Sequence, residues 1–321
     1  MTKIAIIGPI PRDTIKTYKG EVIQKYGCVS HPTIALAKLF ENTGSTVIPI
    51  SHVHKEDKQA IRSIFNSYSA IVQDGINSNQ DQGTIIELNF IDQNNRIEKQ
   101  TANMAPIMPL DVKPFLDADS FVFVPITDFE IQLETLRYIK ENSNATIVFD
   151  AHGPTTYINK NGDRLRQYWK DKEAWFAYID VLKMNLEESH CCWFDVDFNN
   201  AVYDDNNTSH LDEFAEYSLN KGIDVLYVTL DSRGCAVYTK SQDGNIQKDF
   251  IPSIPVKDVI DTTGCGDSFA GGLAYGFNRF KDPVIAAQYA NVLGALRTQG
   301  KDFEVFKTRF ETDAIVKRHY V

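Results

Sequence analysis

The stretch VIDTTGCGDSFAGGLAYGF, residues 259–277, sets two glycines directly before an aspartate and a run of small and apolar residues behind it. Phe269, Leu273 and Phe277 recur every four residues, which predicts the buried stripe of a helix that begins near Ser268. Two glycines before the first turn allow successive backbone N–H groups to converge beside the positive end of the helix dipole. Such a turn is suited to bind an anion.

Asp267 lies at the exit of this turn, where its carboxylate would repel an anionic ligand. The conflict disappears if the carboxylate faces an attacking hydroxyl and accepts its proton while the amides hold a phosphoryl group. Phosphoryl transfer needs these parts: donors for the equatorial oxygens, a base for the hydroxyl and a divalent cation. A helix capped by Asp or Thr, with glycines that only turn the chain, is the alternative, and a bare G-x-G-D favours that alternative.

Along the chain that must position this turn, short apolar runs alternate with amphipathic segments typical of helices. Residues 32–44 and 130–143 are two such amphipathic segments. Apolar runs without polar alternation predict strands that are buried on both faces. They lie at residues 3–7, 45–50, 120–124, 146–150, 181–185 and 225–230. This alternation predicts an α/β fold with a mainly parallel, doubly wound sheet flanked by helices. Because no repeat or linker interrupts the chain, we expect residues 1–321 to form a single domain.

Residues 83–103 depart from this pattern, because Ile86, Leu88 and Phe90 alternate with polar residues and a polar turn follows at residues 92–95. The alternation predicts a hairpin with one apolar face. The sequence leaves open whether this hairpin extends the edge of the sheet or forms a flap over a cleft.

Composition and charge narrow the class of protein. The chain of 321 residues is 43% hydrophobic and 24% charged, and its net charge of -10 argues against nonspecific binding to nucleic acid or to an anionic membrane. We expect neither a signal peptide nor a membrane-spanning segment, since the apolar runs are too short. Five cysteines without a C-x-x-C spacing favour a reducing compartment, so we expect a cytoplasmic protein.

Common motifs of other enzyme classes are absent from the sequence. It has no G-x-x-x-x-G-K-S/T loop, no strand-borne G-x-G-x-x-G, no H-E-x-x-H and no G-x-S-x-G. P-loop kinases, dinucleotide enzymes, zincins and serine hydrolases are therefore excluded as serious alternatives.

The segment D-T-T-G-C-G-D, Asp261 to Asp267, resembles the second signature of the PfkB-type carbohydrate kinases, the ribokinase family. The resemblance implies a ribokinase-like fold and an ATP-dependent, magnesium-requiring transfer of the γ-phosphoryl group to a hydroxyl of a sugar or related polyol. In this interpretation Asp267 is the base, and the amides of Gly264, Cys265 and Gly266 help to hold the transferring phosphoryl group. The thiol of Cys265 takes no part in the reaction.

Two upstream segments resemble further motifs of the family. Asn185 and Glu188 in KMNLEES have the N-x-x-E spacing, which implies that they order magnesium and its waters, whereas in isolation they would be a helix cap. The segment VTLDSRGCAVY resembles the turn T-L-G-x-x-G beside the nucleotide. Thr229 and Gly234 match it, but Asp231 replaces a glycine, so we expect weaker nucleotide binding or a displaced loop.

The resemblance implies two more contacts in the last third of the chain. Asn291, on the helix after the catalytic one, would contact the nucleotide beside the adenine pocket. Asp261 and Thr263 match the positions that hold a monovalent cation such as K⁺ in the family.

The acceptor end departs further from the family. Asp13 stands where a carboxylate binds sugar hydroxyls, and a carboxylate can accept two hydrogen bonds from vicinal hydroxyls, although a plain turn residue is the alternative. The first signature, G-G-x-x-x-N, is changed here so that Tyr26, Gly27 and His31 take its defined positions. Gly27 and His31 would still face the substrate, and a small β lid is expected from about residues 14–28 and 83–105. Homodimer formation through that lid is left open.

Two alternatives remain at this point. A nucleoside kinase of adenosine-like specificity would need an aromatic or apolar stacking surface around Asp13. A sugar-binding regulatory protein with weakened catalysis would explain Asp231 and the changed first signature, but it leaves the intact turn before Asp267 without a purpose.

Overall fold

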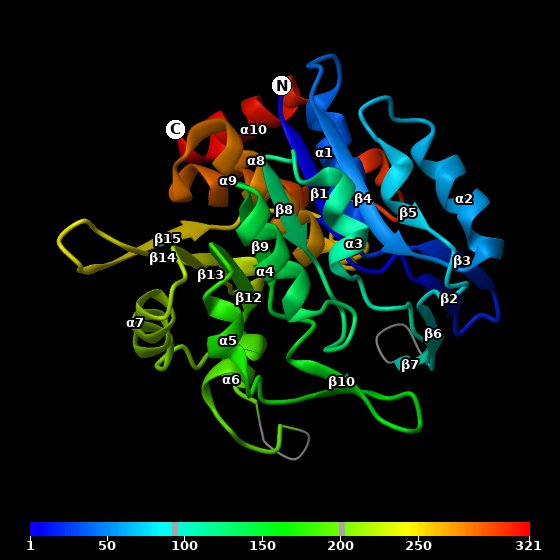
Figure 1. The fold of residues 1–321 in the computed structure, drawn as a ribbon, viewed down its shortest axis with the longest axis horizontal. Coiled ribbons are helices and arrows are strands. Elements are labelled where there is room, and N and C mark those ends of the chain that lie inside the picture. Colours follow the sequence, from blue (N-terminus) through cyan, green and yellow to red (C-terminus); the bar gives the residue numbers. More distant parts are fainter. Residues whose placement is uncertain (92–95, 199–202) are drawn as a thin grey trace.

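A nine-stranded sheet crosses the computed structural model, which describes residues 1–91, 96–198 and 203–321 (Figure 1). Its strand order is β15-β14-β13-β12-β9-β8-β1-β4-β5, and the strands from β13 to β5 run parallel. The last two strands, β14 and β15, are added antiparallel at one edge. The bounds are β1 Lys3–Ile7, β4 Thr46–His52, β5 Ile76–Asn77, β8 Ser120–Phe123, β9 Thr146–Asp150, β12 Val181–Asn185, β13 Val225–Thr229, β14 Gly234–Lys240 and β15 Ile246–Pro252.

This architecture confirms the predicted doubly wound α/β fold. All six predicted apolar runs are strands of the large sheet, and β1, β9 and β12 have the predicted bounds. Residues that alternate along the strands belong to different clusters: Ile4 and Ile6 bury on one face, and Ala5 and Ile7 on the other. The continuous hydrophobicity of the central strands follows from this two-sided burial.

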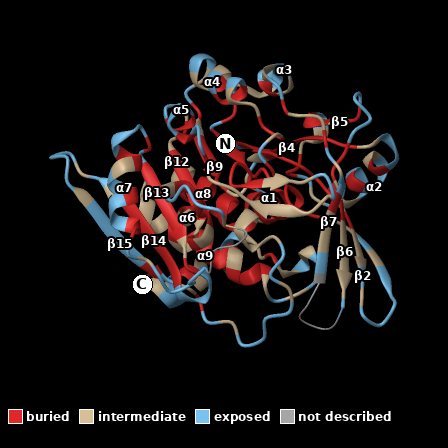
Figure 2. Cartoon of the chain, turned by 90° about the horizontal axis from the view of Figure 1, so that it is seen from below, coloured by how far each residue is buried: buried red, intermediate tan, exposed pale blue. Residues whose placement is uncertain are grey.

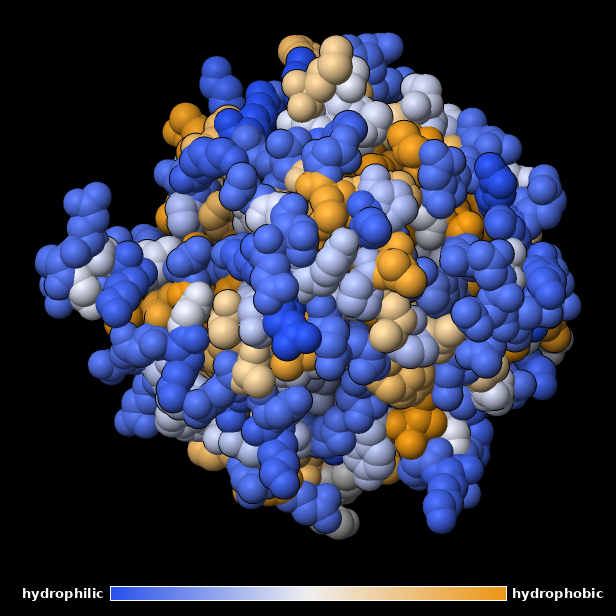
Figure 3. Space-filling view, in the orientation of Figure 1, coloured by the Kyte–Doolittle hydropathy of each residue, from blue (hydrophilic) through white to orange (hydrophobic). Residues whose placement is uncertain are grey.

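Helices cover both faces of the sheet. One side is packed by α1 Ser30–Phe40, α2 Lys55–Phe65, α8 Cys265–Phe280, α9 Pro283–Arg297 and α10 Arg309–Tyr320. The other is packed by α3 Pro109–Val112, α4 Leu133–Asn142, α5 Lys172–Phe176, α6 Leu186–Trp193 and α7 Leu211–Asn220. Figure 2 shows the buried residues concentrated in the sheet and in α8 and α9, and the face in Figure 3 is largely hydrophilic. No helix in the described ranges is both long and apolar enough to cross a membrane.

A separate four-stranded sheet of order β3-β2-β6-β7 stands at one end of the molecule (Figure 2). Its strands are β2 Arg12–Lys16, β3 Val22–Tyr26, β6 Ile85–Phe90 and β7 Arg96–Ala102. Strands β6 and β7 pair antiparallel as the predicted hairpin, and the turn predicted at residues 92–95 lies outside the described residues. The hairpin therefore does not extend the edge of the large sheet. A third, two-stranded sheet consists of β10 Thr156–Ile158 and β11 Arg164–Arg166.

The helix that carries Asp267 starts earlier than the sequence predicts. It begins at Cys265 rather than near Ser268, because Gly264 adopts a left-handed conformation with φ +81° and turns the chain sharply into the helix. Gly266 and Asp267 therefore belong to its first turn. Farther along, Gly272 lets α8 approach α9 closely, since a Cβ at this position would lie 2.5 Å from the Cα of Ala290.

Candidate active site

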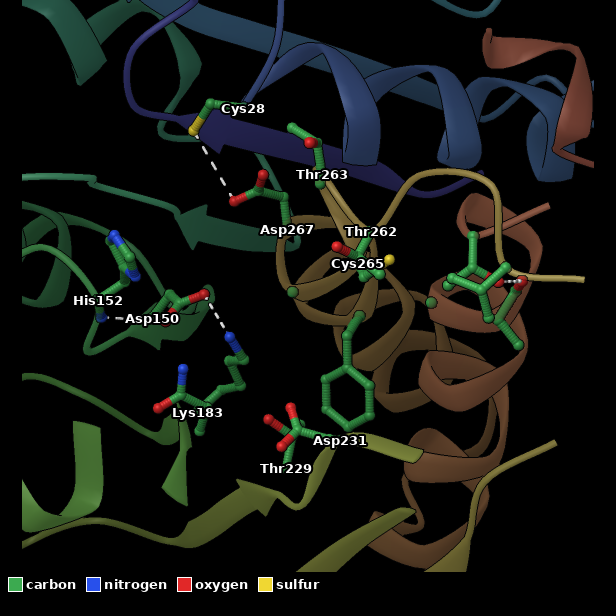
Figure 4. A pocket seen from close by; sticks show the side chains of 18 of the residues that line it. Cys28, Asp150, His152, Lys183, Thr229, Asp231, Thr262, Thr263, Cys265 and Asp267 are labelled. Atoms are coloured by element: carbon green, nitrogen blue, oxygen red, sulfur yellow. Dashed lines mark hydrogen bonds and ion pairs between the residues drawn. The ribbon is translucent and has the colours of Figure 1, made fainter. Parts of the chain in front are cut away.

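A cavity of about 820 Å³ opens where β9, β12 and β13 end, and residues at the start of α8 and in the four-stranded sheet also line it. Figure 4 shows ten of its side chains with labels. The carboxyl ends of parallel strands are the usual position of a ligand site in a doubly wound sheet. The cavity brings together most of the residues singled out in the sequence: Asp13, Asn185, Glu188, Thr229, Asp231, Gly234, Thr263, Gly264, Cys265, Gly266, Asp267 and Asn291.

Gly27, His31 and Asp261 are not among the residues that line this cavity. Gly27 lies beneath Asp13, and a Cβ there would lie 2.9 Å from Oδ2 of that carboxylate. His31 is only 4% exposed and packs behind Gly264. The structure thus places Gly27 and His31 directly behind residues that line the cavity, and their contact with the substrate stays a prediction.

The Asp267 carboxylate points into the cavity near Cys28 (Figure 4). The Sγ of Cys28 lies 3.8 Å from Oδ1 of Asp267. Burial raises the pKa of Asp267 to about 6, while the Lys183 ammonium opposes this rise. Asp267 is thus mostly ionised at neutral pH yet close enough to neutrality to accept a proton, as a general base requires.

Backbone donors surround Asp267 at the start of α8. Helix geometry leaves the N–H groups of the first turn without an acceptor within the helix, and Gly266 and Asp267 belong to that turn. A Cβ at Gly266 would lie 3.0 Å from Nζ of Lys183, so the glycine lets an ammonium approach the same turn. Burial raises the pKa of the Cys265 thiol to about 12, so the thiol stays protonated and unreactive.

Lys183 and Asp150 form a buried ion pair on the cavity floor, with 2.7 Å between Nζ and Oδ2. Burial alone would lower the pKa of Lys183, but the carboxylates of Asp150, Glu188 and Asp267 outweigh it and raise the value. The lysine is therefore a fixed positive charge. Sequence reasoning missed this pair, although a lysine within the apolar run 181–185 was a usable signal.

Asn185 and Glu188 form a reciprocal cap at the start of α6. Asn185 Oδ1 accepts from Glu188 N at 2.7 Å, and Glu188 Oε2 accepts from Asn185 N at 2.8 Å. The other Glu188 oxygen, Oε1, lies 2.8 Å from His152 Nδ1. Burial of Glu188 is outweighed by the His152 hydrogen bond and the Lys183 charge, which hold its pKa well below the ordinary range. These contacts show Asn185 and Glu188 as a helix cap. They are also compatible with the role in ordering magnesium, since a capped carboxylate can still bind metal-bound waters.

The residues present fit a magnesium ion that is held mainly by phosphate and water. Among the residues with described placement, no group of three or more His, Cys, Asp or Glu side chains is arranged to hold a metal. Mg²⁺ commonly keeps several waters and takes few protein ligands at phosphoryl-transfer sites. Both Glu188 oxygens already have protein partners, which favours contact through such waters.

The acceptor end of the cavity combines charged groups with aliphatic walls. Asp13 is 8% exposed, and burial raises its pKa to about 7 while Arg164 opposes the rise. Arg164, on β11, has its Nη1 3.7 Å from Glu98 and donates through Nη2 to His152 Nε2 at 2.9 Å. Because Nε2 accepts here, His152 carries its proton on Nδ1 and donates it to Glu188. This chain of bonds joins the acceptor end to the N-x-x-E carboxylate.

The opposite end of the cavity begins at the turn after β13. Asp231 has φ +51°, so it adopts the left-handed backbone that the expected glycine would favour, with its side chain at the surface. Gly234 is required, because a Cβ there would lie 2.1 Å from the carbonyl oxygen of Ile251. Asn291 donates through Nδ2 to the carbonyl oxygens of Ile251 and Pro252, so its N–H groups hold β15 in place.

The Asp261 carboxylate is already matched by positive side chains. Its Oδ2 lies 2.9 Å from Arg297 Nη2 and 3.6 Å from Lys25 Nζ, and its Oδ1 accepts from the N–H of Thr263 at 3.0 Å. A monovalent cation does not fit a carboxylate that two cationic side chains already neutralise. Thr263 itself lines the cavity.

Comparison with known proteins identifies similarity to carbohydrate kinases. The sequence pattern of the family described as pfkB family carbohydrate kinase matches residues 118–303. Probable fructokinase-2 of Arabidopsis thaliana is 32% identical over 100 residues, 28% of this chain and 28% of that protein. An uncharacterised sugar kinase of Archaeoglobus fulgidus is 33% identical over 81 residues, 25% of this chain and 30% of that protein. The chain thus aligns with less than a third of the length of these curated relatives.

Solved structures show the same fold over nearly the whole chain. Ribokinase from Giardia lamblia superposes with a TM-score of 0.75 at 18% identity, over 99% of both chains. Arabidopsis thaliana ribokinase complexed with ribose and ATP has a TM-score of 0.73 at 14% identity, over 99% of both chains. A pyrophosphate-dependent kinase in the ribokinase family, complexed with a pyrophosphate analogue and myo-inositol, has a TM-score of 0.70 at 18% identity, over 94% of this chain and 98% of that chain. These structures establish the ribokinase-like fold.

The buried ion pair between Lys183 and Asp150 leads to a prediction about the stability of the fold. Replacing Lys183 by Met leaves Asp150 buried without its counter-charge, which is expected to lower the free energy of unfolding by about 3–5 kcal/mol at pH 8. Burial raises the pKa of Asp150 and the Lys183 ammonium opposes this rise, so without the lysine the carboxyl group takes up a proton more readily as the pH falls. The deficit should therefore shrink at lower pH, and also in the double variant with Asp150→Asn. Urea denaturation measures these differences, with Lys221→Met, which loses an exposed pair with Glu173, as the mild control. If Lys183→Met were as stable as Lys221→Met, the result would contradict the account of Lys183 and Asp150 as a buried ion pair.

Proposed function

Because the chain belongs to the pfkB family of carbohydrate kinases, we propose that it transfers the γ-phosphoryl group of ATP to a hydroxyl of a sugar or related polyol. The observation that carries this proposal is the convergence of a carboxylate, a lysine ammonium and first-turn amides on one point of a large cavity. In-line phosphoryl transfer requires a base on the nucleophile side and fixed positive charge around the transferring group.

Asp267 is the base in the proposed reaction. As the acceptor oxygen forms its bond to phosphorus, its proton passes to the Asp267 carboxylate, and the bond from phosphorus to the ADP leaving oxygen breaks. The amides of Gly264, Gly266 and Asp267 and the Lys183 ammonium are the donors proposed for the charge that builds up on the phosphoryl oxygens, while the Cys265 N–H donates to the Thr262 carbonyl oxygen at 3.2 Å. Magnesium, held through waters near Asn185 and Glu188, supplies further charge neutralisation when it is bound.

The walls of the cavity favour a nucleotide as the donor. Beyond Thr229, the cavity is lined by apolar side chains that include Ile254, Val256, Val259 and Ala295. An adenine ring would bury this surface, whereas inorganic pyrophosphate would leave it in contact with water. The amide of Asn291 holds β15, which leads directly into this apolar segment, so we assign Asn291 a supporting role at the nucleotide site. The exposed acid of Asp231 is expected to weaken nucleotide binding.

The acceptor end favours a sugar or polyol over a nucleoside. Asp13 and Glu98 offer oxygens that accept hydrogen bonds from hydroxyls, and Arg164 offers donors. Phe269 is the only Phe, Tyr or Trp among the described residues that line the cavity, and its ring packs edge-on against Tyr227 within the core. A nucleobase at the acceptor end would therefore meet the aliphatic side chains of Ile86 and Leu88 but no aromatic ring, so the nucleoside kinase remains the second candidate. Ile86 and Leu88 of β6 line the cavity, which supports the proposal that the four-stranded sheet acts as its lid.

Loss of the base tests the proposal most simply. Asp267→Asn should lower turnover by about 10²–10⁴-fold, because the amide cannot accept the hydroxyl proton. Turnover is measured as ADP or phosphate release with ATP and with pyrophosphate, over a panel of sugars, polyols and nucleosides. Calorimetry should show nearly unchanged ATP binding. Asp231→Asn, which removes another acid of the same cavity, should keep turnover within about tenfold.

The outcomes of that panel are distinct. Full activity of Asp267→Asn would contradict the mechanism. Turnover of nucleosides alone would favour the nucleoside kinase, and tight sugar binding without any turnover would favour a regulatory protein.

The two raised pKa values predict an unusual pH profile. Both Asp13 and Asp267 must be ionised, the first to accept hydrogen bonds from hydroxyls and the second to accept the proton. Since their pKa values are about 7 and about 6, log kcat/KM should fall with a slope of one below about pH 7 and approach two below about pH 6. In Asp13→Asn the slope should remain one. A flat profile down to pH 5 would contradict both assignments.

A further inference from the structure

We propose that the guanidinium of Arg297 is a built-in cation that fixes the glycine turn before Asp267, so that the kinase works without a bound monovalent cation. This inference rests on the proposed function. It starts from the misfit of a monovalent cation at Asp261, whose carboxylate is already paired with Arg297 and Lys25. Arg297 is the last residue of α9, only 1% exposed, and does not line the cavity.

All three nitrogens of the guanidinium are engaged. Nη2 lies 2.9 Å from Asp261 Oδ2, Nη1 donates to the Gly300 carbonyl oxygen at 2.6 Å, and Nε donates to His31 Nδ1 at 3.1 Å. A guanidinium can only donate, so His31 Nδ1 is the acceptor and its ring carries the proton on Nε2. The planar fork of an arginine suits this arrangement, and the point charge of a hydrated ion would not reproduce it.

These bonds hold the catalytic turn from both ends. At its start, Asp261 is bound by the guanidinium and accepts from the N–H of Thr263. At its end, the His31 ring packs so closely under Gly264 that an added Cβ would lie 2.2 Å from the ring. Arg297 fixes that ring through Nε. A single side chain therefore positions the backbone amides that we assign to the phosphoryl group.

The charges around Asp261 leave no role for a bound monovalent cation. Arg297 and Lys25 together carry two positive charges against the one carboxylate of Asp261. A third cation would be repelled at close range. The group of Arg297, Lys25 and Asp261 therefore carries a net positive charge, and it lies next to the turn proposed to bind the phosphoryl group. A fixed cation is useful there, and an exchangeable one is unnecessary. Arg297 is thus a positioning residue, and His31 acts with it rather than on the acceptor.

Cation dependence of the wild-type protein is the first test. Activity is measured in a tetramethylammonium salt and after replacement of that salt by KCl or NaCl at constant ionic strength. We expect kcat/KM to change by less than about twofold, and the Tm to stay constant, because no ion binds the native state selectively. Thallium(I), a spectroscopic probe for potassium sites, should show no bound ²⁰⁵Tl NMR signal. A tenfold activation by K⁺, or a bound thallium signal that K⁺ displaces, would overturn the proposal.

Replacement of the arginine is the second test. Arg297→Met keeps most of the side-chain stem but removes the charge, and should reduce kcat by about 10²-fold or more, since displaced amides stabilise the transition state poorly. Arg297→Lys should recover only part of this loss. Arg279→Met is the matched control, because it removes an arginine–aspartate pair with Asp313 far from the turn and should leave kcat unchanged. Wild-type kcat in Arg297→Met would overturn the proposal.

The two proposals can fail separately. If no acceptor is phosphorylated in any salt, the proposed function fails, while the Tm and thallium measurements still decide whether a monovalent cation binds. If Arg297→Met does not fold, the salt series on the wild-type protein decides alone.

Discussion

The turn before α8 has to bring backbone amides, an ammonium group and a carboxylate to one point with no side chain between them. Gly264 meets this demand with a left-handed backbone against the His31 ring, and Gly266 leaves room for Lys183. The cavity around the turn contains more acidic than basic side chains, although its proposed donor is a polyanion. The arrangement is workable because two of these acids already have partners: Asp150 forms an ion pair with Lys183, and Glu188 accepts hydrogen bonds from the backbone N–H of Asn185 and from His152. Free donors then remain at the helix mouth for the phosphoryl group.

Most of the large sheet was predictable from the sequence, because strands buried on both faces need uninterrupted apolar runs, and residues 3–7, 146–150 and 181–185 have the predicted bounds. Strands β14 and β15 were not predicted as strands. The burial pattern of β15 is largely exposed, so its sequence lacks a continuous apolar run. The start of α8 was misplaced because side-chain periodicity begins at Phe269, whereas the helix itself is set by the backbone conformation of Gly264. The periodicity of apolar residues indicates which part of a helix packs on the core, and it does not locate a first turn that lies outside the core.

The candidate site was predictable where it depends on local sequence and not where it depends on tertiary contacts. Residues 262–267 of the glycine turn, Asn185 and Glu188 of N-x-x-E, and Asp13 all line the cavity. Arg164 and His152 come from a polar hairpin and a strand end that carry no distinctive pattern, and only the fold brings them to the acceptor end. His31 and Asp261 were expected to bind ligands directly. Their neighbour Arg297, which lies 36 residues from Asp261 and 266 from His31 along the chain, takes both as partners, and no local pattern reveals such contacts.

The central claim is that one point in the cavity joins the base, the transferring group and the acceptor hydroxyl. A crystal structure with ADP, magnesium, aluminium fluoride and the best acceptor of the sugar panel would test it most directly. The account predicts the acceptor hydroxyl within about 3 Å of an Asp267 oxygen, and the fluorides facing Lys183 and the amides of Gly264, Gly266 and Asp267. An acceptor hydroxyl directed away from Asp267, or a fluoride complex bound elsewhere in the cavity, would contradict it.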